Sequence, residues 1–334
     1  MNPLMSALFL PNALLASLSM GLGPASVPDT GIPSTTPDLL FASPTRLDHV
    51  GRIVVPVMID GKGPFRFIVD TGASSSTISP QAAIALGLDP AQQATMVVNG
   101  ITGTQEVPSV AIGRLVAGDI VIEDIHLPVI WAPLMAGADG ILGVAGFRQE
   151  IVFVDFQRNR VVISRSVPAS NRVGYEKVPA KVLGDGLMTV DGRINGIPVR
   201  AIIDTGSERS LGNAALREAL NGQHNGMKSN LTDVYGATTD IVAGEVRRVP
   251  TITLGPVNIS DATVVFGDFH IFGVWGMNDR PAVIIGMDVL GTATSLGIDF
   301  KRSEVYFGAV ERSRDPNFGW ESMATHQPGS PPAR

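Results

Sequence analysis

PFRFIVDTGA occupies residues 64–73 of this 334-residue chain, and PVRAIIDTGS occupies residues 198–207. Both decapeptides place a proline six residues and an arginine four residues before the aspartate of an Asp-Thr-Gly motif. One tripeptide of common residues occurs by chance in a chain of this length on the order of ten per cent of the time, so a single copy would be a weak signal. Two copies in register with a longer repeat indicate an internal duplication.

The sequence before each motif predicts a β-hairpin that ends at the aspartate. In the first copy, the apolar-rich run 52–59 leads into the turn Asp-Gly-Lys-Gly at residues 60–63. In the second copy, the run 187–194 leads into Asn-Gly at residues 195–196, which is a strong hairpin signal between apolar segments. Each aspartate is therefore expected at the end of the second strand of its hairpin.

Three further landmarks follow each motif in the same order: a short helical stretch, an apolar pair ending in glycine, and an apolar-Asp-Phe segment. They lie at residues 80–86, 141–143 and 154–156 in the first copy, and at 213–220, 284–286 and 298–300 in the second. Four matched landmarks make a duplication far more probable than coincidence.

The duplication predicts an all-β-dominated fold of two lobes related by a pseudo-twofold axis. The lobes are expected at residues 46–166 and 175–310, with the boundary near 168–174. Glycine and proline are frequent, at 37 and 24 residues, and they favour many short strands and only short helices.

The chain ends are expected to lie outside the lobes. Residues 1–25 carry an apolar stretch followed by small residues and predict a signal peptide, which implies a periplasmic or secreted protein. Because no Lys or Arg precedes Arg46, an uncleaved membrane anchor and a misplaced start site stay open as alternatives. Residues 26–45, rich in Pro, Ser and Thr, predict a linker, and residues 311–334 predict a flexible tail.

Composition excludes several classes of function. The chain has 25 Lys and Arg against 31 Asp and Glu, a formal charge of −6, which argues against a nucleic-acid partner. It has no cysteine, so disulfides, cysteine nucleophiles and thiolate zinc sites are excluded. The five histidines show no metal-binding spacing, and we expect neither a metal nor an organic cofactor.

Asp70 and Asp204 are the candidate catalytic residues, because a pseudo-twofold assembly can bring their loops together where the lobes meet. Two carboxylates about 3 Å apart cannot both ionise easily, so they share a proton and their apparent pKa values separate. One carboxyl can then act as a base toward water while the other donates a proton to a carbonyl oxygen. The two pKa values belong to the pair rather than to either residue.

The other motif residues are expected to support this dyad. Glycine has no Cβ, so it lets two loops approach closely. Threonine has a short hydroxyl, which can bond the facing loop and fix the carboxylates. These dyad-supporting residues are Thr71, Gly72, Thr205, Gly206 and Ser207.

Small differences between the copies suggest an asymmetric dyad. The hydroxyl of Ser207 is positioned in sequence to bond Asp204, whereas Ala73 offers the first aspartate no such partner. Arg66 and Arg200 are expected to be solvated or paired strand residues, although either could tune a carboxyl pKa.

With these motifs in place, the sequence resembles the aspartic proteases of the pepsin and retropepsin superfamily, and most of all the bacterial retropepsin-like proteins with two fused lobes. Their paired aspartates are the standard example of the pKa splitting described above. The resemblance covers residues 46–308. It implies that Asp70 and Asp204 are the catalytic dyad and that residues 141–143 and 284–286 pack beside the active loops.

The same resemblance implies β-hairpin flaps over the cleft. Their candidates are residues 98–107 and 234–242, with Gly100 and Tyr235 as candidate substrate contacts. Tyr235 is the only aromatic residue in these stretches, but its place in the second copy departs from the pepsin arrangement.

The resulting hypothesis is an aspartic endopeptidase that hydrolyses a strand-like peptide or protein substrate and is active as a monomer. Membrane contact is expected only if the N-terminal segment is uncleaved. One alternative is a non-catalytic peptide-binding module of the same fold. Another is a glycosidase with carboxyls about 5 to 9.5 Å apart, which the low content of 3 Trp and 3 Tyr disfavours.

Overall fold

The computed structural model describes residues 39–44, 46–47, 51–92, 94–118, 120–130, 135, 137–166, 174–184, 186–221 and 230–310. The predicted signal peptide at 1–25 and the predicted tail at 311–334 lie outside the described residues, as does most of the predicted boundary at 168–174. In the described part of the chain, no helix is both long and apolar enough to cross a membrane.

Both predicted hairpins are present and end at the Asp-Thr-Gly motifs. Their turns use positive φ at Asp60 (48°) and Asn195 (48°), each followed by a glycine at positive φ. Asp-Gly and Asn-Gly are the pairs that tolerate two consecutive positive φ angles, which matches the twist of the flanking strands. The strands are β3 (Ile53–Ile59) and β4 (Lys62–Val69) in the first repeat, and β13 (Met188–Ile194) and β14 (Ile197–Ile203) in the second.

The two repeats continue with similar series of elements, in which η1 is described only for the first repeat and α3 only for the second. In the first repeat these are β5 (Thr77–Ile78), α1 (Pro80–Leu86), η1 (Pro90–Gln92), β6 (Thr95–Asn99), β7 (Thr104–Ala117), β8 (Ile120–Pro128), β9 (Gly140–Leu142), η3 (Val144–Gly146), β10 (Glu150–Asp155) and β11 (Arg160–Arg165). In the second they are β15 (Leu211–Gly212), α2 (Ala214–Asn221), β16 (Asn230–Tyr235), β17 (Ile241–Leu254), β18 (Val257–Phe266), α3 (His270–Val274), β19 (Ala282–Ile285), α4 (Met287–Leu290), β20 (Ser295–Asp299) and β21 (Glu304–Phe307).

The two predicted helices form where small polar residues can cap them. Ser79 Oγ accepts the backbone N–H of Ala82 at 3.1 Å and starts α1, and Gly87, at φ 84°, ends it. Asn213 Oδ1 accepts the N–H of Leu216 at 2.9 Å, so α2 begins one residue later than predicted. The longest helix in the described part has 8 residues, which confirms an all-β-dominated fold.

The apolar-apolar-Gly segments lie beside the strands that carry the aspartates. β9 runs parallel to β4, with Ile141 opposite Ile68, and β19 runs parallel to β14, with Ile284 opposite Ile202. This placement agrees with the one implied by the resemblance. The two β-strand pairs form matching floors beneath the motif loops.

Strands from both repeats also combine into one sheet. β10 and β20 are antiparallel neighbours with Phe153 opposite Gly297, and the order across this region is β1-β11-β10-β20-β21-β12. The flanking strands are β1 (Leu39–Pro44) and β12 (Glu176–Val182), and the short β2 (Arg46–Leu47) pairs with β3. β12 also pairs with β13, the first strand of the second hairpin. The sheet therefore extends to the hairpin that precedes the second motif. The first repeat has its own sheet, in the order β5-β9-β4-β3-β7-β6.

β1 lies inside residues 26–45, so the linker prediction is wrong for that part. The Pro, Ser and Thr content of the region suggested a linker, but its last residues include the apolar run Leu-Leu-Phe-Ala at 39–42. This run pairs with β11, with Phe41 opposite Ile163. Local composition could not reveal a partner strand so distant in the sequence.

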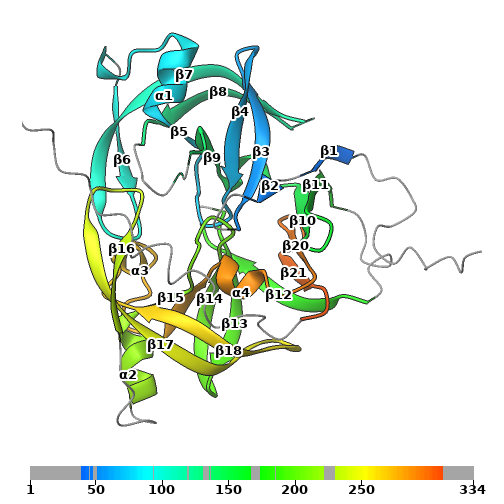
Figure 1. Cartoon of the computed structure of the whole chain (residues 1–334), viewed down its shortest axis with the longest axis vertical. Coiled ribbons are helices and arrows are strands. Elements are labelled where there is room, and N and C mark those ends of the chain that lie inside the picture. The colour runs from blue at the N-terminus through cyan, green and yellow to red at the C-terminus, as the bar shows by residue number, and fades with distance from the viewer. Residues whose placement is uncertain are drawn as a thin grey trace, which may run out of the picture. The chain divides into compact units, whose positions relative to one another are not determined.

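The predicted flaps are hairpins. Residues 98–107 span the turn between β6 and β7, and residues 234–242 span the turn between β16 and β17. Figure 1 shows the two hairpins on the same side of the molecule, approaching each other from opposite directions.

Because β20 is buried, we expect the shared sheet to contribute strongly to the free energy of unfolding. Leu296 is fully buried there, so Leu296→Ala should lower the free energy of unfolding by about 2–5 kcal/mol through lost transfer energy and a residual cavity. Leu231, which is 78% exposed on β16, is the matched control, and Leu231→Ala should change stability by less than about 0.5 kcal/mol. Urea denaturation of both variants checks this, and equal effects would contradict it.

Candidate active site

The two Asp-Thr-Gly loops meet, and each aspartate is fixed to the strand floor of its own repeat. The backbone N–H of Asp70 donates to the carbonyl of Leu142 at 3.1 Å, and that of Asp204 donates to the carbonyl of Ile285 at 3.1 Å. The same register in both repeats places the two carboxyls opposite each other. Their side chains are joined by a hydrogen bond.

The glycines of the motifs are required by space. A Cβ on Gly72 would overlap the carboxyl group of Asp204, and a Cβ on Gly206 would overlap that of Asp70. Neither glycine has a positive φ, so the backbone conformation alone would admit other residues. The close approach of the two loops is therefore what excludes every larger side chain.

The threonines of the motifs hold the loops together from beneath. Thr71 Oγ1 donates to the carbonyl of Ile203 at 2.8 Å and accepts the N–H of Thr205 at 3.1 Å. Thr205 Oγ1 donates to the carbonyl of Val69 at 2.7 Å and accepts the N–H of Thr71 at 3.2 Å. Both threonines are fully buried, so these bonds are shielded from water.

Backbone amides bind the carboxyls. Asp70 Oδ1 accepts the N–H of Gly72 at 2.8 Å, and Asp204 Oδ1 accepts those of Gly206 at 2.9 Å and Ser207 at 3.0 Å. The expected bond from the Ser207 hydroxyl to Asp204 is not formed, and that prediction is wrong. The loop curls so that this hydroxyl donates to the carbonyl of Arg209 at 2.8 Å instead.

The pKa values of both carboxyls are raised. Burial raises the pKa of Asp70, while the hydrogen bond with Asp204 and the positive charge of Arg52 oppose part of that rise. Burial, followed by the negative charge of Asp70, raises the pKa of Asp204 well above its ordinary range. The two amide bonds to Asp204 favour its ionised form but are outweighed.

Arg52 is a site residue that the sequence analysis missed. It is 5% exposed and directly precedes β3, whereas Leu187 directly precedes β13 at the equivalent place in the second repeat. The signal was a charged residue at the start of an apolar strand in one copy only. Arg66 and Arg200 are paired strand residues as expected, with Gly137 (3.2 Å) and Asp191 (3.2 Å).

The tips of the two flap hairpins touch. Thr102 Oγ1 and Thr238 Oγ1 share a hydrogen bond of 2.9 Å, and the N–H of Thr239 donates to Gln105 Oε1 at 3.1 Å. Gly100 lies in the first tip and contacts the second one, where an added Cβ would come within 3.2 Å of Thr238. Tyr235, the last residue of β16, is 42% exposed. Their contact with a substrate stays a prediction.

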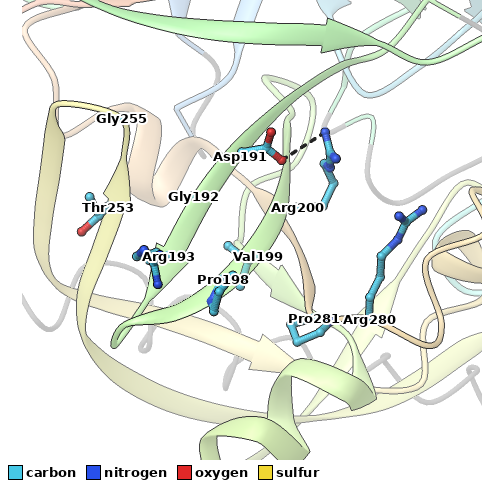
Figure 2. A pocket seen from close by; sticks show the side chains of 10 residues that line it. All are labelled: Asp191, Gly192, Arg193, Pro198, Val199, Arg200, Thr253, Gly255, Arg280 and Pro281. Carbon is cyan, nitrogen blue, oxygen red and sulfur yellow. Dashed lines mark ion pairs between the residues drawn. The ribbon is translucent and has the colours of Figure 1, made fainter.

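A separate hollow of about 530 Å³ lies against the β13–β14 hairpin (Figure 2). Its charged residues include Asp191, Arg193, Arg200 and Arg280. Asp191 is engaged by Arg200 at 3.2 Å and by Lys181 at 2.9 Å, and these contacts lower its pKa. The one carboxylate that lines this hollow is ionised and paired with two cationic side chains. The hollow therefore lacks the acid-base pair found at the motif loops.

The comparison with known protein families agrees with this geometry. A family model described as aspartyl protease matches residues 55–145 and 190–289, together more than half of the chain. Each matched segment contains one Asp-Thr-Gly loop. The match confirms the resemblance inferred from the paired motifs and supports a protease-type function. A search of curated proteins found no match.

The threonine bonds predict a strong coupling between the repeats. Thr71→Val or Thr205→Val leaves a buried N–H and a buried carbonyl unpaired, so each should lower the free energy of unfolding by about 2–4 kcal/mol. The double variant should depart from additivity by about 0.5 kcal/mol or more. Urea denaturation measures the cycle, with Thr95→Val, on the exposed side of β6, as the control. Small additive losses would rule out this role.

The shared proton predicts a directed pKa change. Asp70→Asn removes the negative charge that raises the pKa of Asp204, so that pKa should fall while staying above its ordinary range because burial remains. Carboxyl-carbon NMR titration follows it directly. Because the native pKa is raised, Asp204 contributes stability at low pH that is lost as the pH rises, and Asp70→Asn should reduce that loss. An unchanged Asp204 titration would show that the two groups do not interact.

Proposed function

The chain belongs to the aspartyl protease family, and we propose that it is an endopeptidase in which Asp70 and Asp204 activate water for peptide hydrolysis. The observation that carries this proposal is the pair of hydrogen-bonded carboxyls where the two motif loops meet, both with raised pKa values. A proton retained by such a pair is available for acid catalysis at a pH where an ordinary carboxyl has lost it.

The proposed reaction uses the pair as one acid-base unit. The ionised carboxylate takes a proton from water, whose oxygen bonds to the peptide carbonyl carbon, while the protonated carboxyl donates its proton to the carbonyl oxygen. The C–N bond of the tetrahedral adduct then breaks as the nitrogen takes up a proton, releasing an acid and an amine. Arg52 biases the negative charge toward Asp70. The reaction needs no metal or organic cofactor.

The proposed substrate is a peptide in extended form. The flap hairpins β6–β7 and β16–β17 offer backbone groups to an added strand, and such recognition draws affinity from main-chain hydrogen bonds. Their tips are joined through Thr102 and Thr238, so entry of a peptide requires them to separate. Gly100 and Tyr235 are the proposed contacts on either side of that opening.

We further propose that the protein acts as a monomer in the periplasm or outside the cell, without a nucleic-acid partner. Both aspartates come from one chain, so a second copy is not needed to complete the dyad. The apolar N-terminal stretch supports export. The glycosidase alternative requires carboxyls at least about 5 Å apart, whereas here each carboxyl lies against the glycine of the facing loop and shifts the pKa of the other.

Cleavage of a diverse peptide mixture by the full-length chain, from acidic to neutral pH, tests the proposal. Asp70→Asn and Asp204→Asn should each lower the cleavage rate by roughly 10²–10⁴-fold, because each removes one half of the acid-base unit. Asp191→Asn, at an exposed carboxylate outside the dyad, is the control and should cleave normally.

Peptide binding without cleavage at every pH would instead support the binding-module alternative. Cleavage that survives both active-loop substitutions would contradict the dyad mechanism.

A further inference from the structure

A carboxyl group outside the dyad is hydrogen-bonded to the loop that carries Asp204. Asp288, in the first turn of α4, accepts two hydrogen bonds from one residue. The Oγ of Ser210 donates to Asp288 Oδ1 at 2.7 Å, and the N–H of Ser210 donates to Asp288 Oδ2 at 3.1 Å. Ser210 is fully buried and ends the loop that begins at Asp204.

Further bonds connect the start of α4 with the same loop. The N–H of Gly286 donates to Ser210 Oγ at 3.1 Å, and the N–H of Met287 donates to the carbonyl of Ser207 at 2.8 Å. The N–H of Asp288 donates to the carbonyl of Glu208 at 3.2 Å. Because Ser207 in turn binds the Asp204 carboxyl, these contacts form a continuous path from Asp288 to the dyad.

The first repeat provides an internal comparison. Ser76 is the counterpart of Ser210, and its Oγ accepts the N–H of Gly143 at 3.1 Å. The N–H of Val144 donates to the carbonyl of Ala73 at 2.9 Å, which repeats the contact between Met287 and Ser207. Ala145, however, stands where Asp288 would be. The carboxyl is therefore an addition to a shared loop architecture, confined to the Asp204 side.

The surroundings of Asp288 shift the pKa of its carboxyl. Burial raises its pKa to about 6, while the Ser210 hydrogen bonds and the positive charge of Arg209 act in the opposite direction. Glu208 lies 4.0 Å from Arg209, and Asp204 is the other acidic group on this loop. In its protonated form, the carboxyl can still accept the Ser210 N–H and can donate to Ser210 Oγ.

We propose that Asp288 is a positioning residue, which holds residues 204–210 through Ser210 and thereby sets the orientation of Asp204 in the dyad. Its catalytic consequence depends on the proposed function. Its effect on the order of the loop does not, so the two can be tested apart.

The loop is tested by hydrogen exchange of backbone amides, with Asp288→Ala and Asp288→Asn compared with the wild type. Asp288→Ala removes both acceptors, so exchange at residues 207–210 should accelerate about fivefold or more. Exchange at residues 73–76 of the first loop should stay unchanged. In Asp288→Asn the amide can accept the Ser210 N–H and donate to Ser210 Oγ, so wild-type protection should return.

Asp155→Ala is the matched control. Asp155 is a buried aspartate, at 8% exposed, that binds Arg158 in the shared sheet. A general loss of stability would speed exchange at 207–210 in both Ala variants, and that result would overturn the proposal. Unchanged exchange at 207–210 in Asp288→Ala would overturn it as well.

The effect of Asp288 on the dyad can be measured both by NMR titration of Asp204 and by enzyme kinetics. Asp288→Ala should shift the pKa of Asp204 as measured by NMR. It should also lower kcat more than it changes KM, and alter the pH profile of activity near 6. Asp288→Asn should restore kcat and abolish the pH dependence near 6. A wild-type pKa of Asp204 and a wild-type kcat in Asp288→Ala would overturn the positioning role. If the wild type cleaves no peptide, the proposed function fails, and the exchange data and the Asp204 pKa still decide the role of Asp288.

Discussion

The reciprocal hydrogen bonding of Thr71 and Thr205 is the interaction on which the site depends. Two closely spaced carboxyls repel each other once both ionise, and the loss of water around them would favour moving them apart. The threonine hydroxyls oppose this separation by using the carbonyls and N–H groups of the facing loop, all shielded from solvent. Glycine in both motifs then becomes obligatory, because the clamped loops leave no room for a Cβ.

The two halves are alike in backbone and unlike in charge. Hairpin, helix, flap and strand floor recur in register, but Arg52 has Leu187 as its counterpart and Asp288 has Ala145. The positive charge of Arg52 acts on Asp70, whereas Asp288 binds Ser210 at the end of the loop that carries Asp204. A duplicated scaffold has thus become an asymmetric site through single side chains.

Sequence patterns sufficed for the features set by local chemistry. Turn pairs such as Asn195-Gly196 and the repeated motif with its matched landmarks predicted the hairpins, the short helices and the meeting of the loops. Features that depend on long-range partners were missed. β1 needed β11 to be recognised as a strand, and the Ser207 hydroxyl found a backbone carbonyl that only the folded loop presents.

The antiparallel contact of β10 with β20 has a consequence for how the chain is made. β10 leaves the ribosome roughly 140 residues before its partner, so at ordinary synthesis speeds its edge waits on the order of ten seconds for β20. An apolar strand with an unpaired edge is a template for pairing with other nascent chains. The topology of this protein therefore makes the time between synthesis of β10 and of β20 the period in which mispairing between chains is favoured.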